Sequence, residues 1–303
     1  MRAVLLTLAL LSARVNASDW ADGSGVDIEV RPGVIYHQAS GEDLKLDLYL
    51  PLDRKRPRPL VIWVHGGGWV SGAREVANLR LLPWLQMGWA AANVSYRLAR
   101  QATAPAAVED VRCAVRWLAE RASELGLDRT RIVLTGGSAG GHLALAAGMQ
   151  PVPNRFDRAC AMNGPGRWRS GEQAPVQVAA IVNLMGITNL PALLEPGTAG
   201  RGYAIEWFGS LPDAQRDGLA RELSPVNLVG PHTPPILSFH GDADDIVPFD
   251  QAQQLHQALA AQNRPAQLVP IPGAKHGFSR AQMVEVMART RDFLTHHGVG
   301  VAP

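Results

Sequence analysis

The stretch Gly136-Gly137-Ser138-Ala139-Gly140 follows a mostly apolar run, 131–135, and precedes a segment rich in alanine and leucine, 142–149. This order predicts a buried strand, a sharp turn at Ser138 and a helix. Flanking glycines permit the tight turn and leave the hydroxyl uncrowded, and the amides of the helix N-terminus point back at the serine. The pattern is that of a nucleophile elbow. The alternative is an ordinary strand-to-helix turn in which the serine only caps the helix.

An acidic turn and a glycine-flanked histidine follow Ser138 in the chain. The turn 242–245 leaves the end of a strand predicted at 236–240, and His276 lies on a turn before the last predicted helix. A serine hydroxyl needs a base within hydrogen-bond reach, and that base needs an orienting acid. We predict His276 as the base, because the other histidines lack both the flexible turn and this place in the order. Among them, His240 ends a strand beside the acids and is predicted to be structural.

Three acids, Asp242, Asp244 and Asp245, compete for the orienting role. From the residues alone the choice stays open. Those that do not orient the histidine are expected to make turn or helix-cap hydrogen bonds.

A second glycine run follows an early buried strand. Five apolar residues, 60–64, lead into His65-Gly66-Gly67-Gly68-Trp69. Glycines allow backbone N–H groups to turn inward, where they stabilise a developing oxyanion. We predict the oxyanion donors to be the amides of Gly67, Gly68 and Ala139, with His65 holding the loop in shape. The alternative is a merely flexible loop.

Together these motifs resemble the HGGG-type α/β-hydrolases, namely the hormone-sensitive-lipase-like esterases and the related acetyl-xylan and feruloyl esterase group. The resemblance extends from about residue 35 to the C-terminus. It implies the order serine, acid, histidine, and it favours Asp244, which stands three residues before Val247-Pro248 as in the DxxVP loop of related hydrolases. Arg100-Gln101 replaces the proline–glutamate pair of the lipase-type relatives, which favours the carbohydrate-ester group. The matching pieces are HGGGW at 65–69, VSYRLA at 94–99, PAAVED at 105–110 with RWL at 116–118, GGSAGGH at 136–142, HGDADDIVP at 240–248 and HGF at 276–278.

Apolar strands alternate with helical segments along most of the chain, which predicts an α/β-hydrolase fold with a mostly parallel, doubly wound sheet. The segment 44–50 alternates between apolar and polar residues, as in a half-exposed antiparallel edge strand. Further strands are predicted at 60–64, 89–96, 131–136, 176–184, 236–240 and 267–271, and helices at 75–87, 105–125, 250–262 and 279–297.

Two stretches, 150–175 and about 186–232, break this alternation. We predict the second to be a small cap insertion over the site. Trp69, His142 and Trp207 are predicted to contact substrate, and Trp168 and Phe208 are further candidates for the lining. For any single aromatic residue, core packing is the alternative.

The N-terminus reads as a signal peptide. Met1-Arg2 precedes an apolar run, 3–11, and small residues end at Ala17. This pattern predicts a leader over 1–17, cleavage after Ala17, a hydrolase domain over 18–303 and a secreted or periplasmic protein. The apolar run is too short to span a bilayer. The alternative is a buried N-terminal helix.

Composition narrows the possible partners. The formal net charge of the 303 residues is +2, which gives no electrostatic case for nucleic acid, and the basic cluster 54–58 reads as a solvated loop. Cys113 and Cys160 show no metal-ligand spacing. Export would permit a disulfide between them, but Cys113 falls in a helical pattern and reads as a small buried hydrophobic residue.

These patterns favour a serine esterase that hydrolyses short-chain carboxylic esters through an acyl-enzyme, with no metal or cofactor. The resemblance points to acetyl or feruloyl esters of plant polysaccharide, and the partner is a small-molecule or carbohydrate-linked ester. Two alternatives stay open: an amidase like kynurenine formamidase, and a non-catalytic binding protein of the same fold. The oligomeric state is not predicted.

Overall fold

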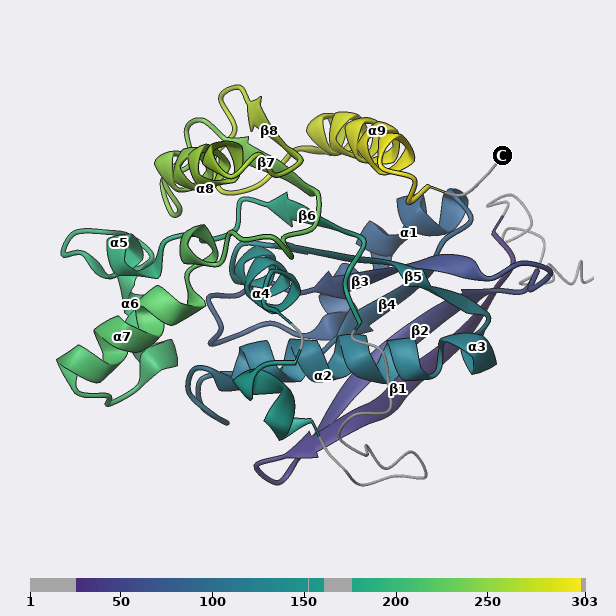
Figure 1. Cartoon of the computed structure of the whole chain (residues 1–303), viewed down its shortest axis with the longest axis horizontal. Coiled ribbons are helices and arrows are strands. Elements are labelled where there is room, and N and C mark those ends of the chain that lie inside the picture. The colour runs from purple at the N-terminus through teal and green to yellow at the C-terminus, as the bar shows by residue number, and fades with distance from the viewer. Residues whose placement is uncertain (1–25, 152, 161–175, 301–303) are drawn as a thin grey trace, which may run out of the picture.

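The computed structural model describes residues 26–151, 153–160 and 176–300. Its centre is an eight-stranded sheet in the order β1-β2-β4-β3-β5-β6-β7-β8 (Figure 1). β2 runs antiparallel to β1 and β4, and all other neighbours are parallel. The predicted doubly wound sheet is confirmed. The strands are β1 Ile28–Ala39, β2 Glu42–Pro51, β3 Arg58–Val64, β4 Ala90–Val94, β5 Leu127–Gly137, β6 Ala180–Leu184, β7 Ile236–Gly241 and β8 Ala266–Ile271.

Helices cover both faces of this sheet, which is why the central strands read as continuous apolar runs. On one face, Leu60 and Ile62 of β3 pack into a core shared with α2 Ala106–Glu120, α3 Ala122–Leu125, α4 Ala139–Gly148 and α8 Asp250–Ala261. On the other face, Val61 and Trp63 pack with α1 Asn78–Gln86 and α9 Arg280–His296. Successive side chains of β3 therefore pack into the cores on opposite faces of the sheet, because side chains alternate between the two faces along a strand.

The prediction that 44–50 forms an edge strand is wrong. β2 is the second strand of the sheet, because β1 pairs with it through a turn at Ser40 and Gly41, whose φ angles are 53° and 77°. Its polar residue Asp47 is buried and accepts hydrogen bonds from the Gly33 N–H and the Arg74 guanidinium. Lys45 and Tyr49 on the same side of β2 are half-buried, so the predicted half-exposed face is present, with a satisfied buried carboxylate between them.

Cys113 and Cys160 form a disulfide. The expectation of a small buried hydrophobic residue was right about the burial of Cys113 but wrong in preferring that role to pairing. A short 3₁₀ helix, Arg155–Ala159, carries Cys160 to α2, and an ion pair between Asp157 and Arg112 at 2.8 Å holds it there. The disulfide joins residues 47 positions apart, a pairing that spacing alone does not reveal.

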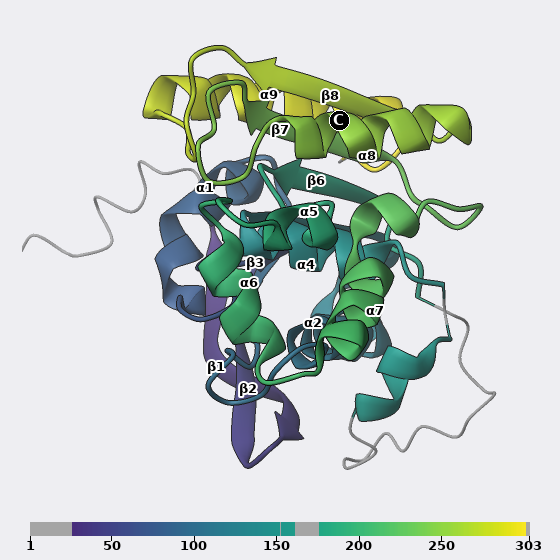
Figure 2. The same ribbon diagram turned by 90° about the vertical axis from the view of Figure 1, so that its left-hand side faces the viewer.

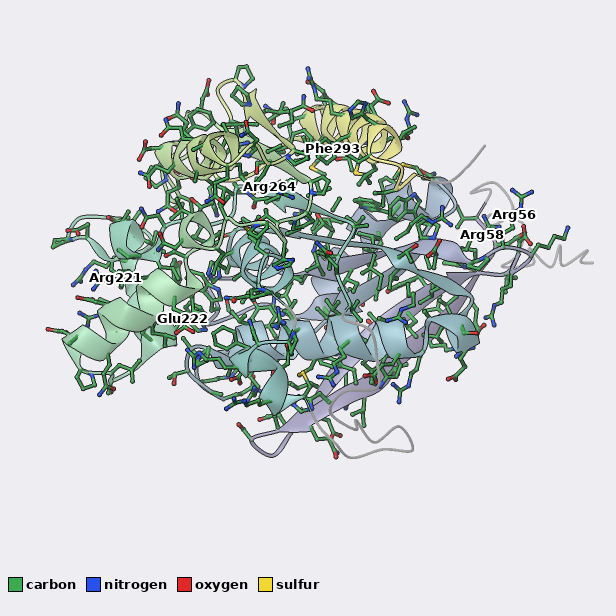
Figure 3. All side chains as sticks on the ribbon, in the orientation of Figure 1. Arg56, Arg58, Arg221, Glu222, Arg264 and Phe293 are labelled. Atoms are coloured by element: carbon green, nitrogen blue, oxygen red, sulfur yellow. A yellow bond between two sulfur atoms is a disulfide. The ribbon has the colours of Figure 1, made fainter. Side chains whose placement is uncertain are left out.

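The segment between β6 and β7 folds as three α-helices, α5 Leu190–Leu194, α6 Arg201–Phe208 and α7 Asp213–Leu223, followed by the 3₁₀ helix Pro225–Asn227. They form the left-hand end of the molecule in Figure 1 and face the viewer in Figure 2. Arg221 and Glu222 on α7 lie at the end opposite Arg56 and Arg58 (Figure 3), so the basic loop predicted at 54–58 is remote from this insertion.

Some predictions fall outside the described residues, among them the leader over 1–17 and the lining role of Trp168. Within the described ranges, no helix combines the length and apolar character needed to cross a membrane.

Candidate active site

Ser138 occupies the junction between β5 and α4. Its φ and ψ are 57° and −126°, a conformation that residues other than glycine rarely adopt. The Ser138 N–H donates to the Leu184 carbonyl at 2.9 Å, and its carbonyl accepts from the His142 N–H at 3.0 Å. Such strain persists only where the surrounding structure enforces it, and it is concentrated at functional sites.

Backbone packing enforces this turn. A Cβ at Gly140 would overlap the Val64 carbonyl oxygen and lie 2.5 Å from that of His65. A Cβ at Gly136 would also lie 2.5 Å from the Val64 oxygen. The first turn of α4 therefore lies directly against the end of β3, and glycine is the residue that permits this approach.

His276 bridges Ser138 and Asp244. Its Nε2 lies 2.8 Å from the Ser138 Oγ, and its Nδ1 lies 2.8 Å from the Asp244 Oδ2. A carboxylate can only accept, so Nδ1 carries the proton and Nε2 is free to accept from the serine hydroxyl. The structure thus brings together three predicted residues that follow β5, β7 and β8. This geometry allows proton transfer from serine to imidazole.

Asp244 is held as a carboxylate. Burial raises its pKa, but hydrogen bonds from His240, His276 and the backbone N–H groups of Val247 and Ile246 outweigh that effect and hold the pKa well below its ordinary value. A carboxylate in contact with His276 can stabilise the charged form of the imidazole ring.

The two neighbouring acids are engaged elsewhere. Asp242 accepts from the Gly273 N–H at 2.7 Å, and the exposed Asp245 pairs with Lys275 at 3.1 Å. Of the three acids, the structure therefore brings Asp244 to His276. Within the described ranges, no three His, Cys, Asp or Glu side chains are grouped as metal ligands.

His240 also contacts Asp244. The sequence predicted a structural role for His240 but not this contact. Its Nε2–H donates to the Val247 carbonyl at 2.8 Å and lies 3.3 Å from the Asp244 Oδ2. His240 and His276 therefore contact the same oxygen of the Asp244 carboxylate. The sequence signal was a histidine four positions before the acid, at the end of a buried strand.

The glycine loop after β3 folds back on itself. Gly67, Gly68 and Trp69 all have positive φ, of 116°, 60° and 63°. The Gly67 carbonyl accepts from the N–H groups of Val70 at 3.1 Å and Ser71 at 3.0 Å. In the part of the chain that the structure describes, the N–H groups of Gly67 and Gly68 make no backbone hydrogen bond, so they remain available to a ligand.

Two further features shape this loop. His65 is buried, its Nδ1–H donates to the Gly66 carbonyl at 2.8 Å, and its ring stacks on Tyr96 with centroids 4.2 Å apart. Burial lowers the pKa of His65, which keeps the ring neutral. Ala139, the third predicted donor, is the first residue of α4, and its N–H belongs to the helix terminus that has no intrahelical acceptor.

The predicted substrate contacts at Trp69, His142 and Trp207 need correction. Their exposed fractions are 1%, 0% and 0%, so they present no surface to a substrate, and Phe208 is equally buried. Trp69 stacks on Trp207 with centroids 4.5 Å apart, and its Nε1–H donates to the His142 Nδ1 at 3.2 Å. The His142 Nε2–H donates to the Leu223 carbonyl at 3.0 Å.

We call Trp69, His142 and Trp207 the aromatic cluster. Burial lowers the pKa of His142 to about 4, so its ring is neutral and serves as acceptor and donor at once. The cluster ties the glycine loop to α4, α6 and α7. The sequence gives the identity of a residue but not the direction of its side chain. It therefore did not show whether these three residues line a pocket or pack against one another in the interior.

Comparison with known proteins agrees with this architecture. A family model described as BD-FAE matches residues 46–259. Esterase LipC of Mycobacterium tuberculosis is 29% identical over 74% of this chain and 54% of its own length. Isoprenylcysteine alpha-carbonyl methylesterase ICME of Arabidopsis thaliana is 28% identical over 82% of this chain and 56% of its own length. The chain thus spans about half the length of these curated relatives.

Two solved structures match over nearly their whole length. A truncated form of a carbohydrate esterase from gut microbiota superposes with a TM-score of 0.71 at 25% identity, covering 89% of this chain and 96% of that one. Thermogutta terrifontis esterase 2 phosphoramylated by tabun gives a TM-score of 0.70 at 27% identity, covering 91% and 97%. The predicted resemblance to HGGG-type α/β-hydrolases is confirmed: the chain belongs to the BD-FAE family and has the α/β-hydrolase fold.

Proposed function

We propose that this protein hydrolyses carboxylic esters through a covalent acyl-enzyme on Ser138. One observation carries the proposal: the His276 ring lies 2.8 Å from both the Ser138 Oγ and the Asp244 Oδ2. The esterase names of its relatives support the same reaction class. The strained serine conformation supports it as well, because neither a helix cap nor a passive turn requires it.

The reaction proceeds in two halves. His276 takes the hydroxyl proton as Ser138 attacks the ester carbonyl, and the N–H groups of Gly67, Gly68 and Ala139 stabilise the oxyanion. His276 then gives the proton to the leaving alcohol, which leaves the acyl group on Ser138. Water repeats the sequence and releases the carboxylic acid. Asp244 keeps the imidazole in the reactive tautomer throughout.

We propose that the substrates are short-chain carboxylic esters, together with acetyl or feruloyl esters of plant polysaccharide. A solved structure described as a carbohydrate esterase supports the carbohydrate part. Propionate-bound and butyrate-bound forms of the Thermogutta terrifontis esterase support short acyl chains. The leader predicted at 1–17 adds export to this proposal, and a mature protein that begins at Ser18 is the expected result of N-terminal sequencing.

Replacement of the nucleophile tests the proposal. Ser138→Ala is expected to lower kcat for p-nitrophenyl acetate by about 10⁴-fold or more, since the attacking atom is lost. The exposed Ser123 on α3 supplies the control, and Ser123→Ala is expected to match the wild type. Retained hydrolysis in Ser138→Ala removes Ser138 as the nucleophile. Acetylated xylan, methyl ferulate and N-formylkynurenine, assayed side by side, separate the esterase from the amidase alternative.

A further inference from the structure

Tyr203 of α6 packs directly on Gly68 of the glycine loop. A Cβ built on Gly68 would lie 2.7, 2.8 and 2.9 Å from the Cγ, Cδ1 and Cβ of Tyr203. No real Cβ approaches other atoms so closely, so the near edge of the tyrosine ring occupies the space beside the Gly68 Cα. The ring therefore borders a backbone N–H that the proposed function uses as an oxyanion donor.

The position of this ring is fixed by the next turn of α6. Trp207 lies four residues after Tyr203 and thus on the same side of the helix. It is completely buried and stacks on Trp69, the residue that follows Gly68. Two aromatic residues of α6 thus face two successive residues of the loop. The aromatic cluster prevents Tyr203 from moving away without repacking the core.

Tyr203 differs from its buried neighbours in its exposure, which is 48%. Of the hydrogen bonds found in the described ranges, none involves its hydroxyl group. A half-exposed aromatic ring whose Cβ and Cγ are held by packing offers apolar contact area at little cost in conformational entropy, and its hydroxyl adds a polar group. Such a surface suits a ligand with an apolar face and peripheral hydroxyl groups, which describes a pyranose ring.

We propose that Tyr203 binds the alcohol part of the ester by stacking against its sugar ring, and so selects sugar esters over simple alkyl esters. This inference rests on the proposed ester hydrolysis. For the acetyl esters of the proposed function it assigns the ring to the alcohol, because an acetyl group ends one carbon beyond the carbonyl and cannot extend past the oxyanion donors. The alcohol part of a polysaccharide ester must instead extend into solvent, and the exposed part of the Tyr203 side chain also faces solvent.

The test uses two acetate esters that differ only in the alcohol, ethyl acetate and methyl O-acetyl-β-xylopyranoside. Tyr203→Ala is expected to lower the ratio of kcat/KM for the xyloside to kcat/KM for ethyl acetate by about tenfold, mainly through KM, the loss that about 1.4 kcal/mol of contact corresponds to. Tyr203→Phe keeps the ring and is expected to lose about threefold. The exposed Arg201 lies two residues before Tyr203 and therefore on a different side of α6, and Arg201→Ala is expected to leave the ratio unchanged.

Each other outcome overturns a distinct statement. Equal loss on both esters in Tyr203→Ala means that the ring only supports the loop, which ends this inference but leaves ester hydrolysis in place. An unchanged ratio removes the sugar assignment. So does a Tyr203→Ala variant in which the ratio of kcat/KM for ethyl butyrate to kcat/KM for ethyl acetate changes more than the ratio for the xyloside to ethyl acetate. Wild-type activity on ethyl acetate without activity on the xyloside does so too. Absence of all ester hydrolysis in the wild type ends the proposed function itself. If Tyr203→Ala does not fold, Tyr203→Leu keeps an apolar contact with Gly68 and gives the same comparison.

Discussion

The site is assembled from two regions that are stabilised in different ways. The loops after β3 and β5 contact each other backbone to backbone, with Gly140 against Val64. The insertion between β6 and β7 is held by side chains, with Trp207 stacked on Trp69 and Leu223 bonded to His142. At a position where two backbones touch, no side chain larger than hydrogen fits, so the contact can be recognised in the sequence as a glycine motif. Side-chain contact leaves no fixed spacing, which is why the sequence predicted an insertion but not its packing.

The largest expected effect breaks the backbone contact. In Gly140→Ala the new methyl group overlaps the Val64 carbonyl, so α4 and β3 must separate. We expect a loss of more than about 4 kcal/mol in the free energy of unfolding, with no measurable ester hydrolysis. Gly218 on α7 is the matched control, because a Cβ there has nothing within 4 Å. Gly218→Ala is expected to be neutral or to stabilise by up to about 1 kcal/mol. Urea denaturation of both variants decides, and a Gly140→Ala protein as stable as the wild type contradicts the backbone account.

The next effect removes the side-chain contact. Trp207→Ala is expected to cost about 3–5 kcal/mol, because a large buried ring leaves a cavity. Trp84 on α1 is buried to the same degree and contacts Trp89, but it faces the opposite core. Trp84→Ala should lose similar stability while kcat is retained, whereas Trp207→Ala should lower kcat as well, since the glycine loop loses its support. Equal kcat values for the two variants, measured well below their unfolding temperatures, would contradict this link between insertion and loop.

A smaller effect appears with pH. Burial lowers the pKa of His142 from 6.5 to about 4. Between pH 4 and 6.5 the His142 ring is therefore protonated in the unfolded chain and neutral in the folded chain. Stability is therefore fully present above pH 6.5 and falls as the pH drops toward 4, by up to about 3 kcal/mol. His142→Gln is expected to flatten the pH dependence of unfolding in this window.

His256 on α8 is the control for that experiment, because burial also lowers its pKa to about 4. His256→Gln should flatten the same curve without changing kcat, since this residue lies outside the aromatic cluster. An unaltered curve in His142→Gln would show that the His142 ring is not held neutral by the fold.

The sequence predicted most of the frame of this molecule. Its apolar runs located the strands after residue 44, and the glycine motifs located Ser138, His276 and the loop at 66–68. What it missed depends on contacts between distant residues. β1 lacks a clean alternation because its pairing with β2 is irregular between Arg31 and Val34 and between Ile35 and His37, so the true edge of the sheet was not predicted. The pairing of Cys160 and the direction of the Trp69 ring are likewise set by tertiary packing and have no local pattern.

The most direct measurement is covalent labelling by a fluorophosphonate, followed by peptide mapping. We expect one adduct, on Ser138, formed quickly in the wild type and far more slowly in His276→Ala, because the imidazole must accept the serine proton. Ester hydrolysis that continues while Ser138 stays unlabelled, or an adduct on another residue that abolishes activity, would contradict the account.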